Sequence, residues 1–149
     1  ELNIGDDGSI VVIGEIVICS DDDGDDGNSG SGSGGATGTW ALSIVNDLDS
    51  KQTNTDCDIG ATDTDTLNFV QNGSSFTFTT EDGNTFYGAI VGDLYSYTGM
   101  WEDQGVSYSA SGSFTINSGL NSFTGNGVVT ATEGTDFCIW SQTLSGTKQ

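Results

Sequence analysis

The chain has 149 residues, with 22 acidic side chains against two lysines, no arginine and no histidine, and its formal charge is −20. Without histidine, the sequence offers no Ser–His–Asp or Cys–His catalytic pair and no imidazole metal ligand. A chain this acidic is a poor partner for nucleic acid or anionic membranes. No stretch of the sequence approaches the ~20 apolar residues of a membrane-spanning helix. The carboxylates lie in Gly- or Thr-rich segments and not in apolar pockets that would suit acid catalysis, so we expect no enzymatic activity.

The first element along the chain is an apolar segment, residues 9–19, with the sequence SIVVIGEIVIC. As an extended strand it is largely apolar on both faces, and its β-branched side chains favour that conformation. A strand of this kind must be buried on both sides, because an exposed one promotes aggregation. The residues expected to make the buried contacts are Ile10, Val11, Val12, Ile13, Gly14, Ile16, Val17 and Ile18.

Residues 20–37, SDDDGDDGNSGSGSGGAT, predict a flexible acidic linker because Gly, Ser and Asp dominate them. The aspartates between Asp21 and Asp26 lack the glycine that an EF-hand loop needs at its sixth position, so they are best interpreted as solvated charge. The chain is therefore expected to divide into an N-terminal β-arm at residues 1–19, a linker at 20–37 and a folded domain at 38–149.

The rest of the chain alternates apolar and polar side chains in short runs, separated by turn dipeptides such as Asn72-Gly73 and Asp82-Gly83. A period of two predicts strands with one buried and one solvated face, and these dipeptides favour tight hairpins. We therefore predict an all-β fold, an antiparallel up-and-down meander of about eight strands that closes into a barrel, with a two-sheet sandwich as the alternative. The expected strands lie near 39–46, 66–71, 75–80, 85–91, 94–102, 105–116, 122–132 and 136–145.

Gly38-Thr39-Trp40 opens the first strand of this domain. Together with the meander, it resembles the Gly-x-Trp that starts lipocalin and avidin-type barrels, and this resemblance implies a calycin-like barrel. Lipocalins pack an arginine from the last strand over that tryptophan. Because this chain has no arginine, we expect Trp140 in the last strand to take the packing role.

The three cysteines are Cys19, Cys57 and Cys138, and an odd count leaves one without a partner inside the chain. We expect a disulfide between Cys57 and Cys138, because one follows the first strand of the domain and the other lies in the last strand. These strands are neighbours if the meander closes. Such a bond contributes roughly 4–5 kcal/mol in the loop-entropy model. Cys19 is then a buried thiol, half of an inter-subunit disulfide or a lipid-modified residue.

An apolar strand followed by a charged linker resembles the N-terminal donor strand of pilus subunits that assemble by donor-strand exchange. In those subunits the extension lies in a groove of the next subunit and adds a strand to its sheet. The resemblance rests on the face from Ile10 to Ile18, whose alternate apolar side chains would fill successive pockets, and on Gly14 in its middle. It implies docking in trans. Docking into the chain's own domain, and an arm that is disordered or removed by cleavage, are the alternatives.

The segment 47–65 is expected to be a long loop with pairs of aspartates. Carboxylate oxygens are the ligands that Ca²⁺ prefers, and Asp56, Asp58, Asp63 and Asp65 form the candidate set for a weak calcium site. The sequence requires no cofactor, and calcium is the one candidate ligand ion.

These features predict a structural subunit of an extracellular filament or cell-surface assembly, in which each copy donates its arm to the next. The partner is a second copy of the chain, arranged head to tail as a homopolymer, and no nucleic acid or membrane span is involved. The alternative is a secreted or surface-anchored calycin-like module that binds a small apolar molecule or a sugar, with the arm docked in cis. A calcium-dependent adhesion module is a third hypothesis.

Overall fold

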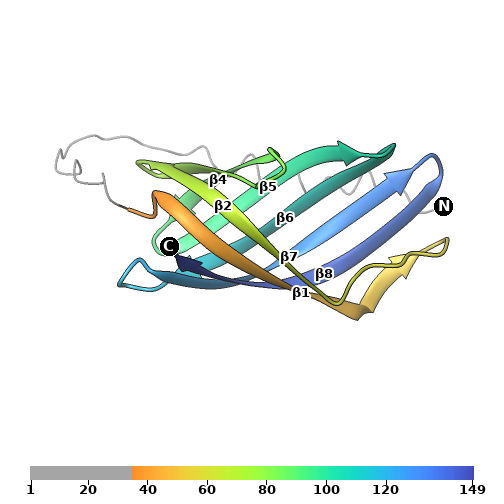
Figure 1. Cartoon of the computed structure of the whole chain (residues 1–149), viewed down its shortest axis with the longest axis horizontal. Helices are drawn as coiled ribbons and strands as arrows, with labels where there is room; N and C mark the ends of the chain where they lie inside the picture. Colours follow the sequence, from red (N-terminus) through yellow and green to blue (C-terminus); the bar gives the residue numbers. More distant parts are fainter. Residues whose placement is uncertain (1–34) are drawn as a thin grey trace. The chain divides into compact units, whose positions relative to one another are not determined.

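The computed structural model describes residues 35–149. They form eight antiparallel strands in sequence order, and β8 pairs with β1 to close a barrel (Figure 1). No helix that could cross a membrane occurs among these residues. The strands are β1 Gly38–Thr53, β2 Thr62–Asn72, β3 Ser75–Thr79, β4 Thr85–Val91, β5 Leu94–Asp103, β6 Val106–Ile116, β7 Ser122–Glu133 and β8 Asp136–Lys148.

The all-β class, the antiparallel meander and the closed barrel predicted from the sequence are confirmed, and the sandwich alternative is not. The main difference concerns the first connection, which was expected to be a loop over 47–65. Instead β1 continues to Thr53 and β2 already begins at Thr62, so the loop is confined to residues 54–61.

The sequence does not indicate the extra length of β1, because the pairing of β1 with β8 is irregular over this part. The register shifts between Asp47 and Gln52, and apolar–polar alternation is lost there. Ser50 stabilises the shifted segment, because its hydroxyl donates to Asp47 O (2.6 Å) and accepts the amide of Ser141 in β8 (2.8 Å). Side-chain hydrogen bonds of this kind can replace ladder bonds where a strand departs from regular geometry.

The interior of the barrel is filled with side chains, most of them aromatic. Phe69 and Phe76 stack with ring centroids 5.0 Å apart, and the centroids of Phe114 and Phe123 are 4.7 Å apart. Such pairs add to the free energy gained by burying the rings. The buried aromatic residues are Trp40, Phe69, Phe76, Phe78, Phe86, Tyr95, Tyr97, Phe114, Phe123 and Trp140.

Several of these rings lie against a glycine on the neighbouring strand. Phe76 pairs with Gly88, and Phe123 pairs with Gly146. A Cβ atom added at Gly88 would lie 2.3 Å from the Phe76 ring, and one added at Gly146 would lie 2.1 Å from the Phe123 ring. Glycine at these positions therefore lets the rings cover the strand, which is one use of glycine inside sheets.

Trp40 is fully buried at the start of β1, and its indole Nε1 donates to the carbonyl of Ala36 (2.7 Å). Lys148, its register partner in β8, places Nζ 6.0 Å from the centroid of the Trp40 ring. The expectation that Trp140 packs over Trp40 is therefore corrected, because Lys148 does so. Trp140 lies nearer the opposite end of β8, where its indole N–H donates to Asn46 Oδ1 (3.0 Å).

The predicted arm, residues 1–19, and residues 20–34 of the predicted linker lie outside the described residues. The first strand, β1, begins at Gly38. Ala36 and Thr37 already contact the barrel: Gln71 Oε1 accepts the Ala36 amide (2.9 Å), and Thr37 Oγ1 accepts the Gln71 amide (3.0 Å).

Candidate binding cup and strand notch at the acidic end of the barrel

The charged residues of the domain gather at one end of the barrel. This acidic end carries the loop 54–61 and the turns that join β3 to β4, β5 to β6 and β7 to β8. Twelve of the thirteen acidic residues from position 38 onward lie there or in the strand segments that lead to it, and only Asp93 lies at the opposite end. Lys51 is the one basic residue on that side. The acidic end therefore attracts cations and repels anions.

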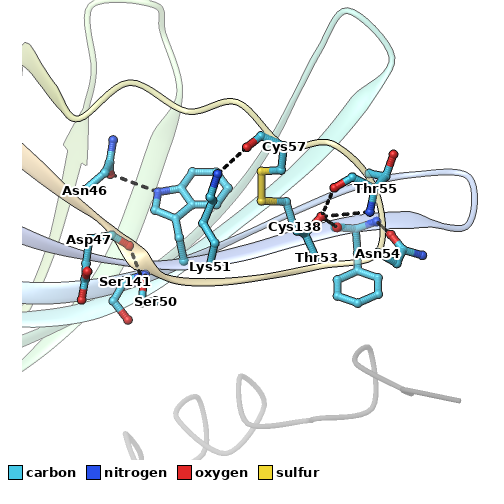
Figure 2. The surroundings of a disulfide bond; sticks show 12 residues. Asn46, Asp47, Ser50, Lys51, Thr53, Asn54, Thr55, Cys57, Cys138 and Ser141 are labelled. Atoms are coloured by element: carbon cyan, nitrogen blue, oxygen red, sulfur yellow. Dashed lines mark hydrogen bonds between the residues drawn. A yellow bond between two sulfur atoms is a disulfide. The ribbon is translucent and has the colours of Figure 1, made fainter.

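The loop 54–61 is fastened to β8 by the predicted disulfide between Cys57 and Cys138, which is present with Cα atoms 6.2 Å apart (Figure 2). Lys51 adds a second attachment, because its Nζ donates to the carbonyl oxygen of Cys57 (2.7 Å). The only cation at the acidic end thus holds the loop against β1.

The start of the loop is fixed to the β7–β8 turn by side chains. The amide of the Asn54 side chain donates to Thr135 O (2.9 Å), and its Oδ1 accepts the backbone amide of Phe137 (2.9 Å). The hydroxyl of Thr53 lies within hydrogen-bond distance of the carbonyl of Phe137 (2.8 Å) and of the carbonyl of Thr55 (2.8 Å). Figure 2 shows Thr53, Asn54 and Thr55 beside the disulfide. The loop is therefore held by side-chain hydrogen bonds as well as by the disulfide.

A cavity of about 330 Å³ lies between this loop and residues of β6, β7 and β8; we call it the cup. Its volume falls in the range of roughly 300–1,000 Å³ that is typical of small-molecule sites. The walls are apolar or aromatic, whereas the exposed rim carries carboxylates. The walls include Cys57, Ile59, Val106, Tyr108, Ala131, Cys138 and Trp140, and the rim carries Asp56, Asp58, Glu133 and Asp136.

The aromatic walls of the cup are held in fixed orientations. Tyr108 stacks on Trp101 with centroids 5.1 Å apart and ring planes 8° from parallel. The hydrogen bond from the indole of Trp140 to Asn46 fixes the other ring. Rings positioned in this way can bind a flat apolar group without losing much conformational entropy.

A second cavity, inside the barrel, is smaller. Its volume is about 120 Å³, and Leu67, Phe78, Phe86 and Tyr97 are among its lining residues. This volume is below the range of ordinary small-molecule sites and near the ~150 Å³ of an apolar cavity that accepts a benzene-sized group. The barrel interior therefore has room for one side chain or a very small molecule.

The barrel wall is incomplete at the acidic end, in a region that we call the notch. β3 is short and pairs only with Asn68–Asn72 of β2, and β4 pairs only with Leu94–Thr98 of β5. Within the described residues, Thr62–Leu67 of β2 and Gly99–Asp103 of β5 therefore have no strand beside them on the sides that face the β3–β4 hairpin. In Figure 1, the hairpin that contains β4 ends short of the end reached by β5 and β6.

One side chain bridges part of the notch. Asp65 Oδ1 accepts the backbone amide of Glu81 in the β3–β4 turn (3.0 Å). The smaller cavity lies behind this point. Its lining includes three residues from the margins of the notch, namely Asp65, Thr80 and Phe86. An unpaired strand edge above an apolar pocket is an arrangement to which another strand can add.

No protein-family model, curated protein or solved structure matches this chain. The likeness of Gly38-Thr39-Trp40 to calycin barrels and of residues 9–19 to pilus donor strands therefore rests on the residues of this chain. Its function must be inferred from the same residues and their geometry.

The structure separates the four aspartates that were predicted as a calcium set. Asp56 and Asp58 lie on the rim of the cup, whereas Asp63 and Asp65 lie in β2. Asp63 Oδ1 accepts the backbone amide of Thr64 (2.8 Å), so this carboxylate supports its own strand. The described residues include no group of three or more acidic or cysteine side chains placed to hold a metal ion.

The predicted donor residues, from Ile10 to Ile18, lie outside the described residues, and their role stays a prediction. Sequence reasoning did not find the cup or the notch. A signal for the notch exists, because Asn72-Gly73 and Asp82-Gly83 leave only eight residues between them; β3 takes five of these, whereas β5 holds ten. No comparable signal marks the cup, whose walls come from four separate segments.

Proposed function

We propose that the chain is a structural subunit of an extracellular filament or surface assembly that polymerises by donor-strand complementation. Residues 9–19 of one copy would add a strand to the barrel of the next copy. A head-to-tail contact of this kind does not close on itself, so it generates a fibre. An extracellular or cell-surface location agrees with the Cys57–Cys138 disulfide, because disulfides persist in oxidising environments.

The observation that carries this proposal is the notch. Among residues 35–149, two strand edges, Thr62–Leu67 and Gly99–Asp103, have no partner strand at one place in the wall. β3 and β4 separate the two edges, so the notch is two strand positions wide and a single inserted arm would pair with one edge. We propose that this edge is Gly99–Asp103 of β5, because Asp65 of β2 is already bonded to the β3–β4 turn. Each edge is long enough for five or six residues of the arm.

The cavity behind the notch supplies an apolar pocket for the inserted strand. Its volume of about 120 Å³ suits one aliphatic side chain, and Leu67, Phe86 and Tyr97 would contact that side chain. Fully burying an Ile or Val side chain contributes about 1.5–3 kcal/mol. The arm carries such side chains at alternate positions from Ile10 to Ile18, with Gly14 between them.

Charge opposes assembly and makes it dependent on salt. Each copy has a formal charge of −20, and the notch lies at the acidic end. Raising the ionic strength from about 0.1 M to about 1 M shortens the Debye length from ~10 Å to ~3 Å, which screens this repulsion. We therefore expect assembly to increase with ionic strength.

Electron microscopy and light scattering of the full chain test the proposal. Filaments are expected at high ionic strength from the native chain and from Asp22→Pro, where proline lies in the linker. They should disappear in Gly14→Pro, because proline in mid-arm removes a ladder hydrogen bond, and in a chain that lacks residues 1–19. Monodisperse monomers from the native chain at every ionic strength, or equal filaments from Gly14→Pro, would overturn the proposal.

A calycin-like module that binds a small apolar molecule or a sugar is the second candidate. It is favoured by the cup and by the contact of Lys148 with Trp40, which matches the place of the lipocalin arginine. In this case the arm docks in cis into the notch of its own chain, and the protein stays monomeric. The same light-scattering measurement separates the two candidates.

A further inference from the structure

We propose that the cup binds an organic cation, namely a protonated amine attached to a flat apolar group. The inference concerns the cup alone and holds whether or not the chains polymerise. It follows from two independent features of the cup, the aromatic walls and the acidic rim. Each feature selects one part of the ligand.

The walls select the apolar part. Tyr108 and Trp140 face a cavity of about 330 Å³ together with Ile59 and Val106, and the disulfide forms a further wall. Tyr108 is backed by Trp101, and Trp140 is 8 % exposed and bonded to Asn46, so neither ring has to reorganise. A flat hydrocarbon group of a few carbon atoms would displace water from these walls.

The rim selects the charge. Asp56 and Asp58 approach the cavity from the loop, and Glu133 and Asp136 approach it from the β7–β8 turn. The nearest cation, Lys51, is already bonded to the carbonyl of Cys57 (2.7 Å). An ammonium group at the mouth of the cup would therefore lie among carboxylates while the attached ring contacts the walls.

Other ligand classes match only part of this arrangement. An anion is repelled by the rim and by the acidic end as a whole. A neutral sugar could stack on Tyr108 and donate hydrogen bonds to the carboxylates, but it would gain nothing from their charge. An aromatic cation uses both features, since the faces of tyrosine and tryptophan also attract cations.

Three probes of similar shape test the inference on the full chain at low ionic strength: 2-phenylethylamine, 2-phenylethanol and 3-phenylpropanoate. Isothermal titration calorimetry measures binding, and tryptophan fluorescence reports contact with the aromatic walls. We expect the amine to bind at least about tenfold more tightly than the alcohol, and the carboxylate to bind more weakly than both. Adding salt should weaken the binding of the amine and leave the binding of the alcohol unchanged.

Two variants that each remove one charge locate the site. Asp136→Asn should lower the affinity for the amine about threefold or more and leave the affinity for the alcohol unchanged. Asp93→Asn, at the opposite end of the barrel, should change neither. Tyr108→Leu should lower the affinity for both the amine and the alcohol. The urea unfolding curve of this variant shows whether the barrel is still folded.

Each of the other results counts against the inference. Equal binding of the amine and the alcohol would overturn the cation assignment and leave an apolar site. Equal losses from Asp136→Asn and Asp93→Asn would show attraction to the acidic chain as a whole instead of to the cup. Absence of binding by both probes would overturn the cup as a site. Electron micrographs of the same samples show independently whether the chains polymerise.

Discussion

Lys148 lies over the indole ring of Trp40, with its Nζ 6.0 Å from the ring centroid, and the two residues are direct partners in the pairing of β8 with β1. The contact therefore joins the last strand to the first at the closure of the barrel. The stem of Lys148 also covers Gly38, where an added Cβ would lie 2.9 Å from Cε. Such a side chain contributes through its apolar stem as well as through its charge.

The first prediction separates the two contributions of Lys148. Lys148→Met keeps an apolar stem and removes the charge, so it should lower the free energy of unfolding by about 0.5–1 kcal/mol. Lys148→Ala removes the stem as well and should cost more. Urea unfolding at equal pH measures both variants. Equal stability of the native chain and Lys148→Ala would contradict a role for this contact in closing the barrel.

The second prediction concerns the disulfide. Replacing both Cys57 and Cys138 by alanine should lower the free energy of unfolding by about 2–5 kcal/mol, because the bond closes a long loop. The bridged residues are 81 positions apart. A thiol reductant should destabilise the native chain by a similar amount and should not affect the double variant. A native chain that keeps its urea midpoint under reducing conditions would refute this expectation.

The third prediction tests the close contact of glycines with neighbouring strands. A Cβ added at Gly125 would lie 2.1 Å from the carbonyl oxygen of Ser113 and 2.5 Å from Cβ of Phe114. Gly125→Ala should therefore destabilise the barrel by about 1–3 kcal/mol through overpacking. Gly60→Ala is the matched control, since its nearest neighbour would be 3.6 Å away. Similar unfolding midpoints for the two variants would contradict the packing described for the interior.

The fourth prediction concerns alkaline pH. Tyr97 is 5 % exposed, and its burial raises the pKa of the phenol well above the ordinary value of 10.0. The unfolded chain then loses this proton at lower pH than the folded chain does. The contribution of protonated Tyr97 to the free energy of unfolding is therefore fully present below about pH 10. It is lost as the pH rises above that value, by up to ~1.4 kcal/mol per pH unit.

Chemical unfolding between neutral and alkaline pH measures this slope. Tyr97→Phe should reduce it, whereas Tyr87→Phe, at a tyrosine that is 60 % exposed, should keep the native slope. The idea fails if Tyr97→Phe and the native chain lose stability in parallel.

Much of the fold could be predicted because its signals are local. In β6, apolar and polar side chains alternate from Val106 to Ile116, and turn dipeptides mark the ends of most strands. Closure of the meander then makes β1 and β8 neighbours, and this topology led to the Cys57–Cys138 pairing. After Asn46 the apolar–polar alternation stops, so the sequence does not indicate that β1 continues. Hydrogen bonds of the Ser50 side chain take the place of regular ladder bonds in this part of the strand.

The candidate sites were less predictable because they depend on contacts between distant segments. Trp140 was expected over Trp40, but its position along β8 places it beside Asn46 and the cup. The cup exists because loop 54–61 folds over the inner faces of β6, β7 and β8, and sequence spacing does not show which way a loop folds. The notch depends on the length of β3 relative to its neighbours, which no single motif records.

Disulfide trapping between two different chains shows whether the arm of one copy pairs with the notch of another. One chain carries Val17→Cys, on the face of the arm that would point out of the barrel, and the other Met100→Cys, at an exposed residue of β5 beside the notch; both carry Cys19→Ser. A third chain with Ser111→Cys, in β6 where both neighbouring strands are paired, replaces the second chain as the control. After mild oxidation at high ionic strength, we expect a cross-linked heterodimer from the Val17 and Met100 pair and none from the control. Absence of the heterodimer, or equal cross-linking with the control, would contradict the account.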